Sequence, residues 1–198
     1  MLVFIDRQHS GKPNKLNDRG ACADIDNNGK KDIHELEAIF TGKIAIELEI
    51  ALLCYGIDVL PISDGLYSKR HQRVNEYAAM YNGSMVYLAM HLNAGGGDYG
   101  AFFYDFRSTK GAELAAAMSE ELKTLPQIQK CKTIAAKPDD WTQHAFNTIS
   151  GINAPVAICC EPLFVDNPAH NVLLLGNEGM ARIANVMATA IAKWGGIK

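Results

Sequence analysis

The stretch MVYLAMH, residues 85–91, is an apolar run of strand length that ends directly in a histidine. A short continuous apolar run of this kind is typical of a strand buried on both faces of a sheet. Four further runs share this character: LVFID at 2–6, IDVLPI at 57–62, AFFYDF at 101–106 and PVAICC at 155–160. Helical patterns lie between or after them, at 37–55, 66–81, 109–124 and 178–194. The alternation predicts an α/β three-layer sandwich, with a twisted, mostly parallel central sheet flanked by helices.

Length and composition fit a single domain spanning residues 1–198. The chain is 48% hydrophobic and 21% charged, which supports a packed core and argues against disorder. Its net charge is −3 and it has no run of lysines and arginines, so nucleic acid is not expected as a partner. The apolar runs are too short for membrane insertion. Residues 126–154 show the weakest pattern and are expected to form loops around the site.

The N-terminus, MLVFIDRQHSG, lacks the basic start and the long apolar stretch of a signal peptide. We therefore expect the protein to be made in the cytoplasm. The five cysteines are odd in number and contain no CxxC pair, which disfavours both a disulfide framework and a zinc–thiolate site.

Three of the predicted strands run into an ionisable residue. LVFID leads to His9, MVYLAM to His91, and PVAICC to Glu161. Each residue alone is more often an ordinary loop or surface residue. Parallel strands, however, bring their carboxyl ends to one edge of a sheet, so we expect the three to converge there. Two imidazoles and a carboxylate suit a catalytic zinc site, and a carboxylate that is not a ligand could move a proton.

Short motifs follow one another in a fixed order along the chain. They are IDRQHSGKP at 5–13, ELEAIFTGKIAIELEIALLCYGIDVLPI at 35–62, AMHLNAGGG at 89–97, GAFFYD at 100–105, APVAICCEPLFVDN at 154–167 and ATAIAKWGG at 188–196. In this order the chain resembles the zinc-dependent N-acetylmuramoyl-L-alanine amidases of bacterial cell-wall hydrolases and phage endolysins. The likeness covers nearly the whole chain. Arg7-Gln8 stands where the family has Pro-Gly before the histidine, and the family's arginine after the second strand has no counterpart in VLPISDG.

The resemblance implies a set of roles. The zinc ligands would be His9, Glu37 and His91, and the catalytic acid/base would be Glu161. From the residues alone, Glu35 stays open as an alternative to Glu37. The predicted substrate-binding residues are Arg73, which resembles an arginine of the family, with Asn93 and His144.

The implied reaction is hydrolysis of the amide between N-acetylmuramic acid and L-alanine in peptidoglycan. An endolysin-like lysin would act on the cell wall after its release. A zinc carboxypeptidase-like peptidase on another substrate remains an alternative. So does a calcium-dependent binding module with a vestigial zinc site.

The stretch CADIDNNGKKDIHELEAIF, residues 22–40, carries a second pattern. It matches the sequence pattern of the calcium loop of an EF-hand. In that loop, spaced oxygen ligands surround the ion and a glycine permits a sharp turn. The predicted ligands are Asp24, Asp26, Asn28, Lys30, Asp32 and Glu35. The alternative is a solvated polar turn before an acidic helix start. We therefore predict a calcium-loop-like insertion at 22–35, immediately before the zinc ligand Glu37.

Overall fold

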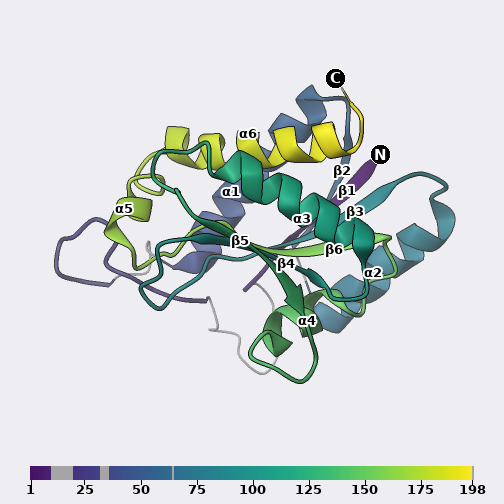
Figure 1. Cartoon of the computed structure of the whole chain (residues 1–198), viewed down its shortest axis with the longest axis horizontal. Coiled ribbons are helices and arrows are strands. Elements are labelled where there is room, and N and C mark those ends of the chain that lie inside the picture. The colour runs from purple at the N-terminus through teal and green to yellow at the C-terminus, as the bar shows by residue number, and fades with distance from the viewer. Residues whose placement is uncertain (10–19, 32–35, 64, 198) are drawn as a thin grey trace.

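A computed structural model describes residues 1–9, 20–31, 36–63 and 65–197 of the chain. Its centre is a six-stranded sheet in the order β2-β1-β3-β6-β4-β5 (Figure 1). The strands are β1 (Leu2–Arg7), β2 (Asp58–Ile62), β3 (Met85–Met90), β4 (Gly100–Asp105), β5 (Cys131–Ala136) and β6 (Val156–Glu161). The helices are α1 (Glu37–Cys54), α2 (Tyr67–Met80), α3 (Thr109–Leu122), α4 (Gln143–Ile149), α5 (Pro168–Asn171) and α6 (Asn177–Trp194).

The sheet is mostly parallel, as predicted. β1 lies parallel to both β2 and β3, β3 is parallel to β6, and β4 is parallel to β5. The exception is β4, which runs antiparallel to β6. A parallel crossover needs a dozen or more residues, usually with a helix, and the short loop between β3 and β4 has neither. The α/β class is therefore confirmed, and the one reversal follows from that connection.

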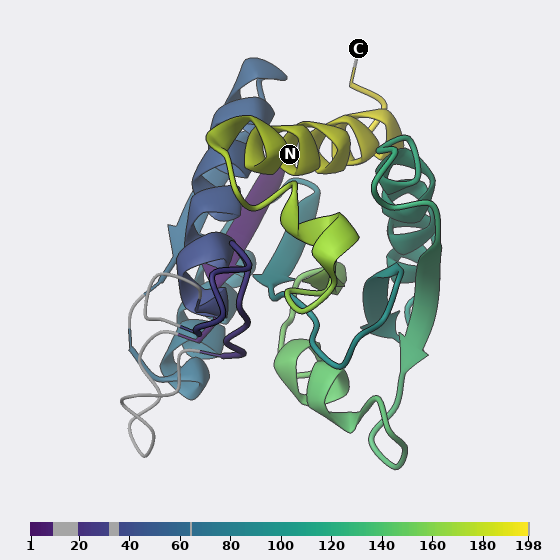
Figure 2. The same cartoon turned by 90° about the vertical axis from the view of Figure 1, so that its left-hand side faces the viewer.

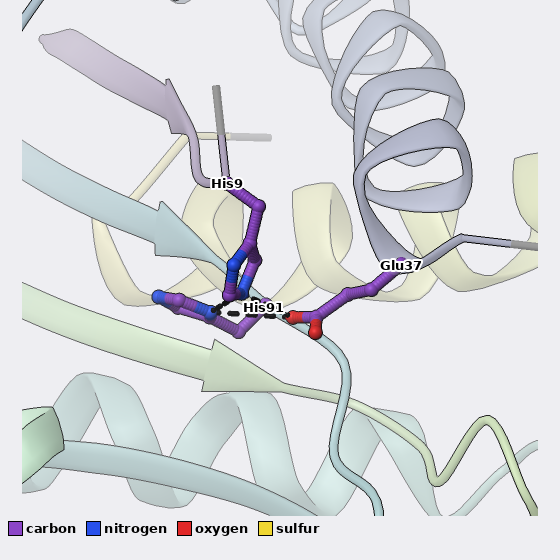
Figure 3. Close-up of side chains that lie close together, drawn as sticks. All are labelled: His9, Glu37 and His91. Atoms are coloured by element: carbon purple, nitrogen blue, oxygen red, sulfur yellow. Dashed lines mark hydrogen bonds and ion pairs between the residues drawn. The ribbon is translucent and has the colours of Figure 1, made fainter. Parts of the chain in front are cut away.

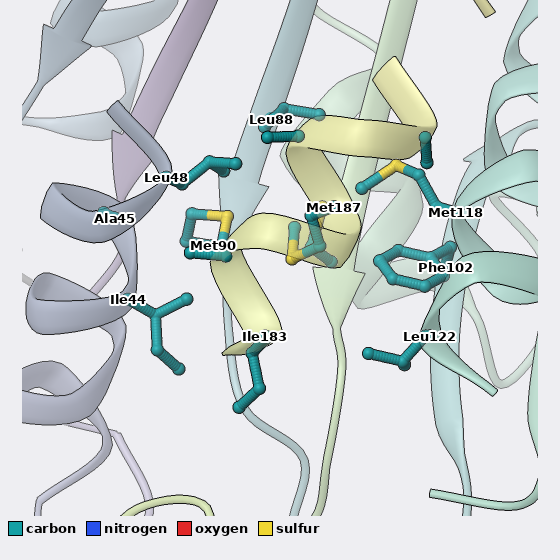
Figure 4. Close-up of a cluster of buried hydrophobic side chains, with 14 of the residues drawn as sticks. Ile44, Ala45, Leu48, Leu88, Met90, Phe102, Met118, Leu122, Ile183 and Met187 are labelled. Atoms are coloured by element: carbon teal, nitrogen blue, oxygen red, sulfur yellow. The ribbon is translucent and has the colours of Figure 1, made fainter. Parts of the chain in front are cut away.

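Helices cover both faces of the sheet. α1, α3 and α6 lie on one side, and α2 and α4 lie on the other (Figures 1 and 2). The strand β3 shows why this arrangement is required, because every one of its residues is buried. Val86, Leu88 and Met90 belong to the core beneath the first group of helices, and alternate residues such as Tyr87 belong to the opposite core. Figure 4 shows Leu88 and Met90 among side chains of α1, α3 and α6.

The segment 126–154, expected to be loop, contains two regular elements. The strand β5 lies at the edge of the sheet, and the helix α4 has only seven residues. The edge position leaves Lys132 and Thr133 exposed. This strand therefore lacks the continuous apolar run that marks a buried strand. Within the described part of the chain, no helix has the length and apolar character needed to span a membrane.

Candidate metal and catalytic site

His9, Glu37 and His91 come together at the carboxyl edge of the sheet (Figure 3). The Nε2 atom of His9 lies 2.9 Å from Nδ1 of His91 and 2.9 Å from Oε1 of Glu37. The distance between His91 Nδ1 and Glu37 Oε1 is 3.3 Å. Three segments far apart in the sequence thus place one nitrogen or oxygen atom each around a common point.

The two histidines are fixed by the ends of neighbouring strands. β1 and β3 pair in parallel register up to Arg7 and Met90, so the residues that follow leave the sheet at the same edge. The backbone N–H of His91 donates to the carbonyl of Cys160, which extends the pairing of β3 with β6. His9 has a φ of 60°, a left-handed backbone conformation that residues other than glycine seldom adopt. Its backbone N–H donates to the hydroxyl of Tyr67, 3.1 Å away.

Glu37 is the first residue of α1, and its buried carboxylate is held from two sides. Oε1 accepts a hydrogen bond from the backbone N–H of Leu92 and Oε2 accepts one from that of Ala21, each at 2.9 Å. The backbone N–H of Glu37 itself donates to the carbonyl of Ala21. Burial acts to raise the pKa of Glu37, but hydrogen bonds from His9 and His91 outweigh it and hold the pKa below its usual range. The carboxylate is therefore an ionised oxygen donor beside two imidazoles.

This donor set fits a zinc ion. Zinc bonds of about 2.0–2.2 Å in a tetrahedral shell separate the ligand atoms by roughly 3.3 Å. The observed separations of 2.9–3.3 Å lie close to that value. Two imidazole nitrogens and one carboxylate oxygen form a typical catalytic set, which leaves a fourth position for water or substrate. The sequence left Glu35 open as an alternative to Glu37; Glu37 is the residue that meets the histidines, and Glu35 lies outside the described residues.

Glu161 ends β6 and lines the same cavity as the three clustered residues. Burial, followed by the negative charge of Glu37, raises its pKa to about 7. The side-chain amide of Asn93 donates to Oε2 of Glu161 at 2.5 Å and partly opposes that rise. Asn93 is itself pinned, because its backbone exchanges hydrogen bonds with Leu163 and Val165. A carboxyl group with a pKa near neutrality can both accept and return a proton.

The cavity at this edge has a volume of about 310 Å³ and reaches α4. His144, predicted to bind substrate, is one of its lining residues. Arg73 is not among the described residues that line it. The sequence analysis did not single out another arginine of α2, Arg70. This side chain is fully buried and donates to Asp6 Oδ1 at 2.7 Å. Helical spacing could have indicated that Arg70 is buried, because Arg70 and Val74 are four residues apart and form the buried face of α2.

The described part of the predicted calcium loop folds around its own side chains. The carboxylate of Asp24 accepts hydrogen bonds from the backbone N–H groups of Asn28 and Gly29, at 3.0 and 2.9 Å. Asp26 accepts from the same Asn28 N–H, at 3.1 Å. The buried side chain of Ile25 anchors the loop to the core. Asp26, Asn28 and Lys30 are exposed, and Asp32 and Glu35 lie outside the described residues.

The sequence matches one protein family along most of its length. The sequence profile of the N-acetylmuramoyl-L-alanine amidase family matches residues 3–193. A search of curated proteins finds no match.

Several solved structures share the fold. One is the N-acetylmuramoyl-L-alanine amidase from Clostridium difficile 630, with 19% identity, a TM-score of 0.73 and coverage of 98% of this chain and 96% of that chain. Another is the amidase AmiC2 of Nostoc punctiforme, with 19% identity, a TM-score of 0.70 and coverage of 99% and 97%. The catalytic domain of the CD27L endolysin targeting Clostridia difficile is 23% identical, with a TM-score of 0.63 and coverage of 98% and 97%. Because the family profile spans nearly the whole chain, this protein belongs to the N-acetylmuramoyl-L-alanine amidases, a family that acts on peptidoglycan.

Proposed function

We propose that the protein is a zinc-dependent hydrolase that cleaves the amide between N-acetylmuramic acid and L-alanine in peptidoglycan. The observation that carries the proposal is the convergence of His9, Glu37 and His91 in one cavity with Glu161. Membership of the amidase family supports it. The expected place of action is the cell wall.

In this proposal His9, Glu37 and His91 hold the zinc. A zinc ion held there would supply Lewis-acid chemistry, which would polarise an amide carbonyl and lower the pKa of water. Glu161 takes a proton from the attacking water and delivers it to the amine nitrogen of L-alanine. The new carbon–oxygen bond forms first and the carbon–nitrogen bond breaks after the nitrogen is protonated, so one water is consumed. The hydrogen bond from Asn93 keeps the Glu161 carboxylate aimed during this transfer.

The proposal is tested by separating metal binding from proton transfer. Glu161→Gln keeps the shape of the side chain but cannot move a proton, so we expect turnover to fall by at least 10²-fold while zinc stays bound. His9→Ala should lose zinc and turnover together. Mass spectrometry of digested muropeptides measures turnover, and elemental analysis measures zinc. Retained turnover in Glu161→Gln would refute the assignment of this residue.

Two other functions are separated by the same measurements. A carboxypeptidase-like peptidase would shorten the stem peptides, whereas the proposed amidase releases free lactyl ends. A calcium-dependent binding module would contain calcium without zinc and would release neither product. Family membership favours the amidase over both alternatives.

We also propose that residues 22–35 bind calcium. The side chains of Asp24 and Asp26 already face the same turn, where both accept from the N–H of Asn28. Calcium is expected to raise the melting temperature of the zinc-loaded protein, and Asp24→Asn should abolish that rise. If calcium and its chelation both leave the melting temperature unchanged, this proposal is wrong.

A further inference from the structure

The hydroxyl of Tyr67 reaches from the start of α2 to the turn that carries His9. Tyr67 is the first residue of α2, and its hydroxyl oxygen accepts a hydrogen bond from the backbone N–H of His9 at 3.1 Å. The two residues are 58 positions apart in the sequence, so this contact belongs to the tertiary structure. Tyr67 also lines the cavity that contains His9, Glu37 and His91. An element outside the sheet therefore contacts the backbone of a predicted metal ligand.

The backbone of His9 requires support from other segments. The parallel register of β1 with β3 ends at Arg7 and Met90, two residues before His9. The φ of 60° at His9 is unfavourable for a residue with a Cβ atom, and such conformations persist only where the surrounding structure fixes them. A proline in this turn would restrict the backbone from within, but the chain has Arg7 and Gln8 before the histidine. Contacts from outside the turn must therefore hold His9.

Arg70 keeps the Tyr67 ring in place. It lies three residues after Tyr67 on α2, and its guanidinium carbon is 5.1 Å from the centre of the ring. The same guanidinium donates to Asp6 Oδ1 at 2.7 Å and to the carbonyl of Arg7 at 3.0 Å. Because Arg70 is fully buried among packed side chains, it has little freedom to move. The start of α2 thus holds the end of β1 at the Asp6 side chain, the Arg7 carbonyl and the His9 N–H.

The backbone conformation of His9 decides where its imidazole lies. Figure 3 shows the side chain extending from the end of β1 towards Glu37 and His91. Its Nε2 atom is 2.9 Å from the nearest ligand atom of each. If φ returned to the negative region, the Cα–Cβ bond would point in another direction and Nε2 would leave this position. A metal site needs its ligand atoms held to within about 0.5 Å, so the support of the His9 backbone bears directly on metal binding.

We propose that Tyr67 is a positioning residue for the metal site, because its hydroxyl holds the His9 backbone in the left-handed conformation that aims Nε2 at the ion. The inference rests on the proposed role of His9 as a zinc ligand. Tyr67 acts through His9 and does not contact the reacting atoms. Its hydrogen bond explains how the histidine is held in a turn that has Arg7-Gln8 in place of Pro-Gly.

Tyr67→Phe tests the inference, because it removes the hydroxyl and keeps the ring that Arg70 covers. We expect zinc affinity to fall about 10- to 100-fold, as for loss of other groups that orient a metal ligand. Competitive zinc titration without substrate measures the change. Tyr55→Phe is the matched control. Tyr55 is also half-buried, its hydroxyl lies 3.0 Å from Thr189 Oγ1, and it follows the end of α1 opposite to Glu37. Its loss should leave zinc affinity within about twofold.

Two further measurements separate positioning from a general effect on stability. Each tyrosine variant loses one partly buried hydrogen bond, so the melting temperature of the metal-free protein should fall by a similar amount in both, roughly 2–4 °C. Exchange of the His9 amide hydrogen, followed by NMR in the metal-free protein, should accelerate at least tenfold in Tyr67→Phe. The same exchange should be unchanged in Tyr55→Phe.

The inference is overturned if Tyr67→Phe binds zinc as tightly as the unmodified protein, or if its His9 amide exchanges at the original rate. Equal losses of zinc affinity in the two tyrosine variants also overturn it, since the effect would then be one of stability. So does a loss of kcat/KM at saturating zinc with unchanged zinc affinity, because Tyr67 would then act on the substrate. Failure of the proposed function looks different: zinc would then bind equally well to His9→Ala, whichever residue stands at position 67.

Discussion

Glu37 shows at the scale of one residue how the site is built. Its two carboxylate oxygens accept backbone hydrogen bonds from Ala21 and Leu92, and Oε1 also faces both histidines. The contact with Ala21 requires the chain to approach closely at Gly20, whose φ is +82°. A Cβ atom at this position would lie 2.3 Å from Glu37 Oε2. The backbone around Gly20 therefore fixes the orientation of the acidic ligand.

Gly20→Ala should consequently disturb the metal site. The added methyl group must displace the Glu37 carboxylate, so we expect zinc affinity to fall about 10- to 100-fold, as for loss of a supporting contact around a metal ligand. Gly29→Ala is the matched control. Its φ of +84° imposes similar backbone strain, but a Cβ there meets no atom within 4 Å. Competitive zinc titration measures both variants, and equal losses in the two would contradict the argument.

The raised pKa of Glu161 predicts that the stability of the metal-free protein depends on pH. Burial and the charge of Glu37 raise its pKa from 4.5 to about 7 in the folded state. The folded protein therefore holds a proton that the unfolded chain has released between these values, and stability falls as pH rises through that window. Glu161→Gln removes this contribution, so its stability relative to the unmodified protein should increase by roughly 3 kcal/mol from about pH 4 to about pH 8. Urea denaturation across this range tests it, and a constant difference would contradict the shift.

At the scale of elements, the buried side chain of Arg70 connects α2 to the sheet. Arg70 is fully buried and bonds to Asp6 on β1, while Tyr87 on β3 donates to the other oxygen of Asp6. The Arg70 guanidinium also donates to the carbonyls of Ser63 and Gly65, which precede α2. One side chain thus joins the end of β1, two residues before Gln8, to the start of the helix that carries Tyr67.

Arg70→Met should be strongly destabilising. It leaves the Asp6 carboxylate buried without its counter-charge, which costs roughly 3–5 kcal/mol in comparable buried pairs. Arg73→Met, on the same helix but not fully buried, should cost less than about 1 kcal/mol. Adding Asp6→Asn to Arg70→Met should recover part of the loss. Equal effects of the two arginine variants in urea denaturation would show that the buried pair contributes no special stability.

The apolar runs of the buried strand β3 and of the edge strand β2 could be predicted from the sequence, whereas the strand β5 and the helix α4 could not. The apolar run of β3 serves two cores at once, so its pattern is unambiguous. The strand β5 is half exposed and α4 is short, so neither shows a clear period. The same limit applies to the site. Strand ends indicated His9, His91 and Glu161, whereas Glu37 was predicted only through the family resemblance. Its position depends on the backbone around Gly20 and Ala21, which the periodicity of strands and helices does not report.

At the scale of the whole molecule, the cluster of His9, Glu37 and His91 connects three segments that are far apart in the sequence. His9 follows β1, Glu37 begins α1, and His91 follows β3. The sheet brings the two histidines together, and the loop before α1 brings the carboxylate to them. An ion at this point would bind the folded chain and not the unfolded one, because the three ligands are far apart in sequence.

Zinc should therefore stabilise the entire fold. At a free concentration about 100 times the dissociation constant, binding contributes about 2.7 kcal/mol, which corresponds to a rise in melting temperature of roughly 5–11 °C for a chain of this size. His9→Ala should abolish the rise. His144→Ala is the matched control, because His144 lines the same cavity but does not belong to the cluster of three. Calorimetry with and without zinc measures the shift, and a full rise in His9→Ala would place the ion elsewhere in the molecule.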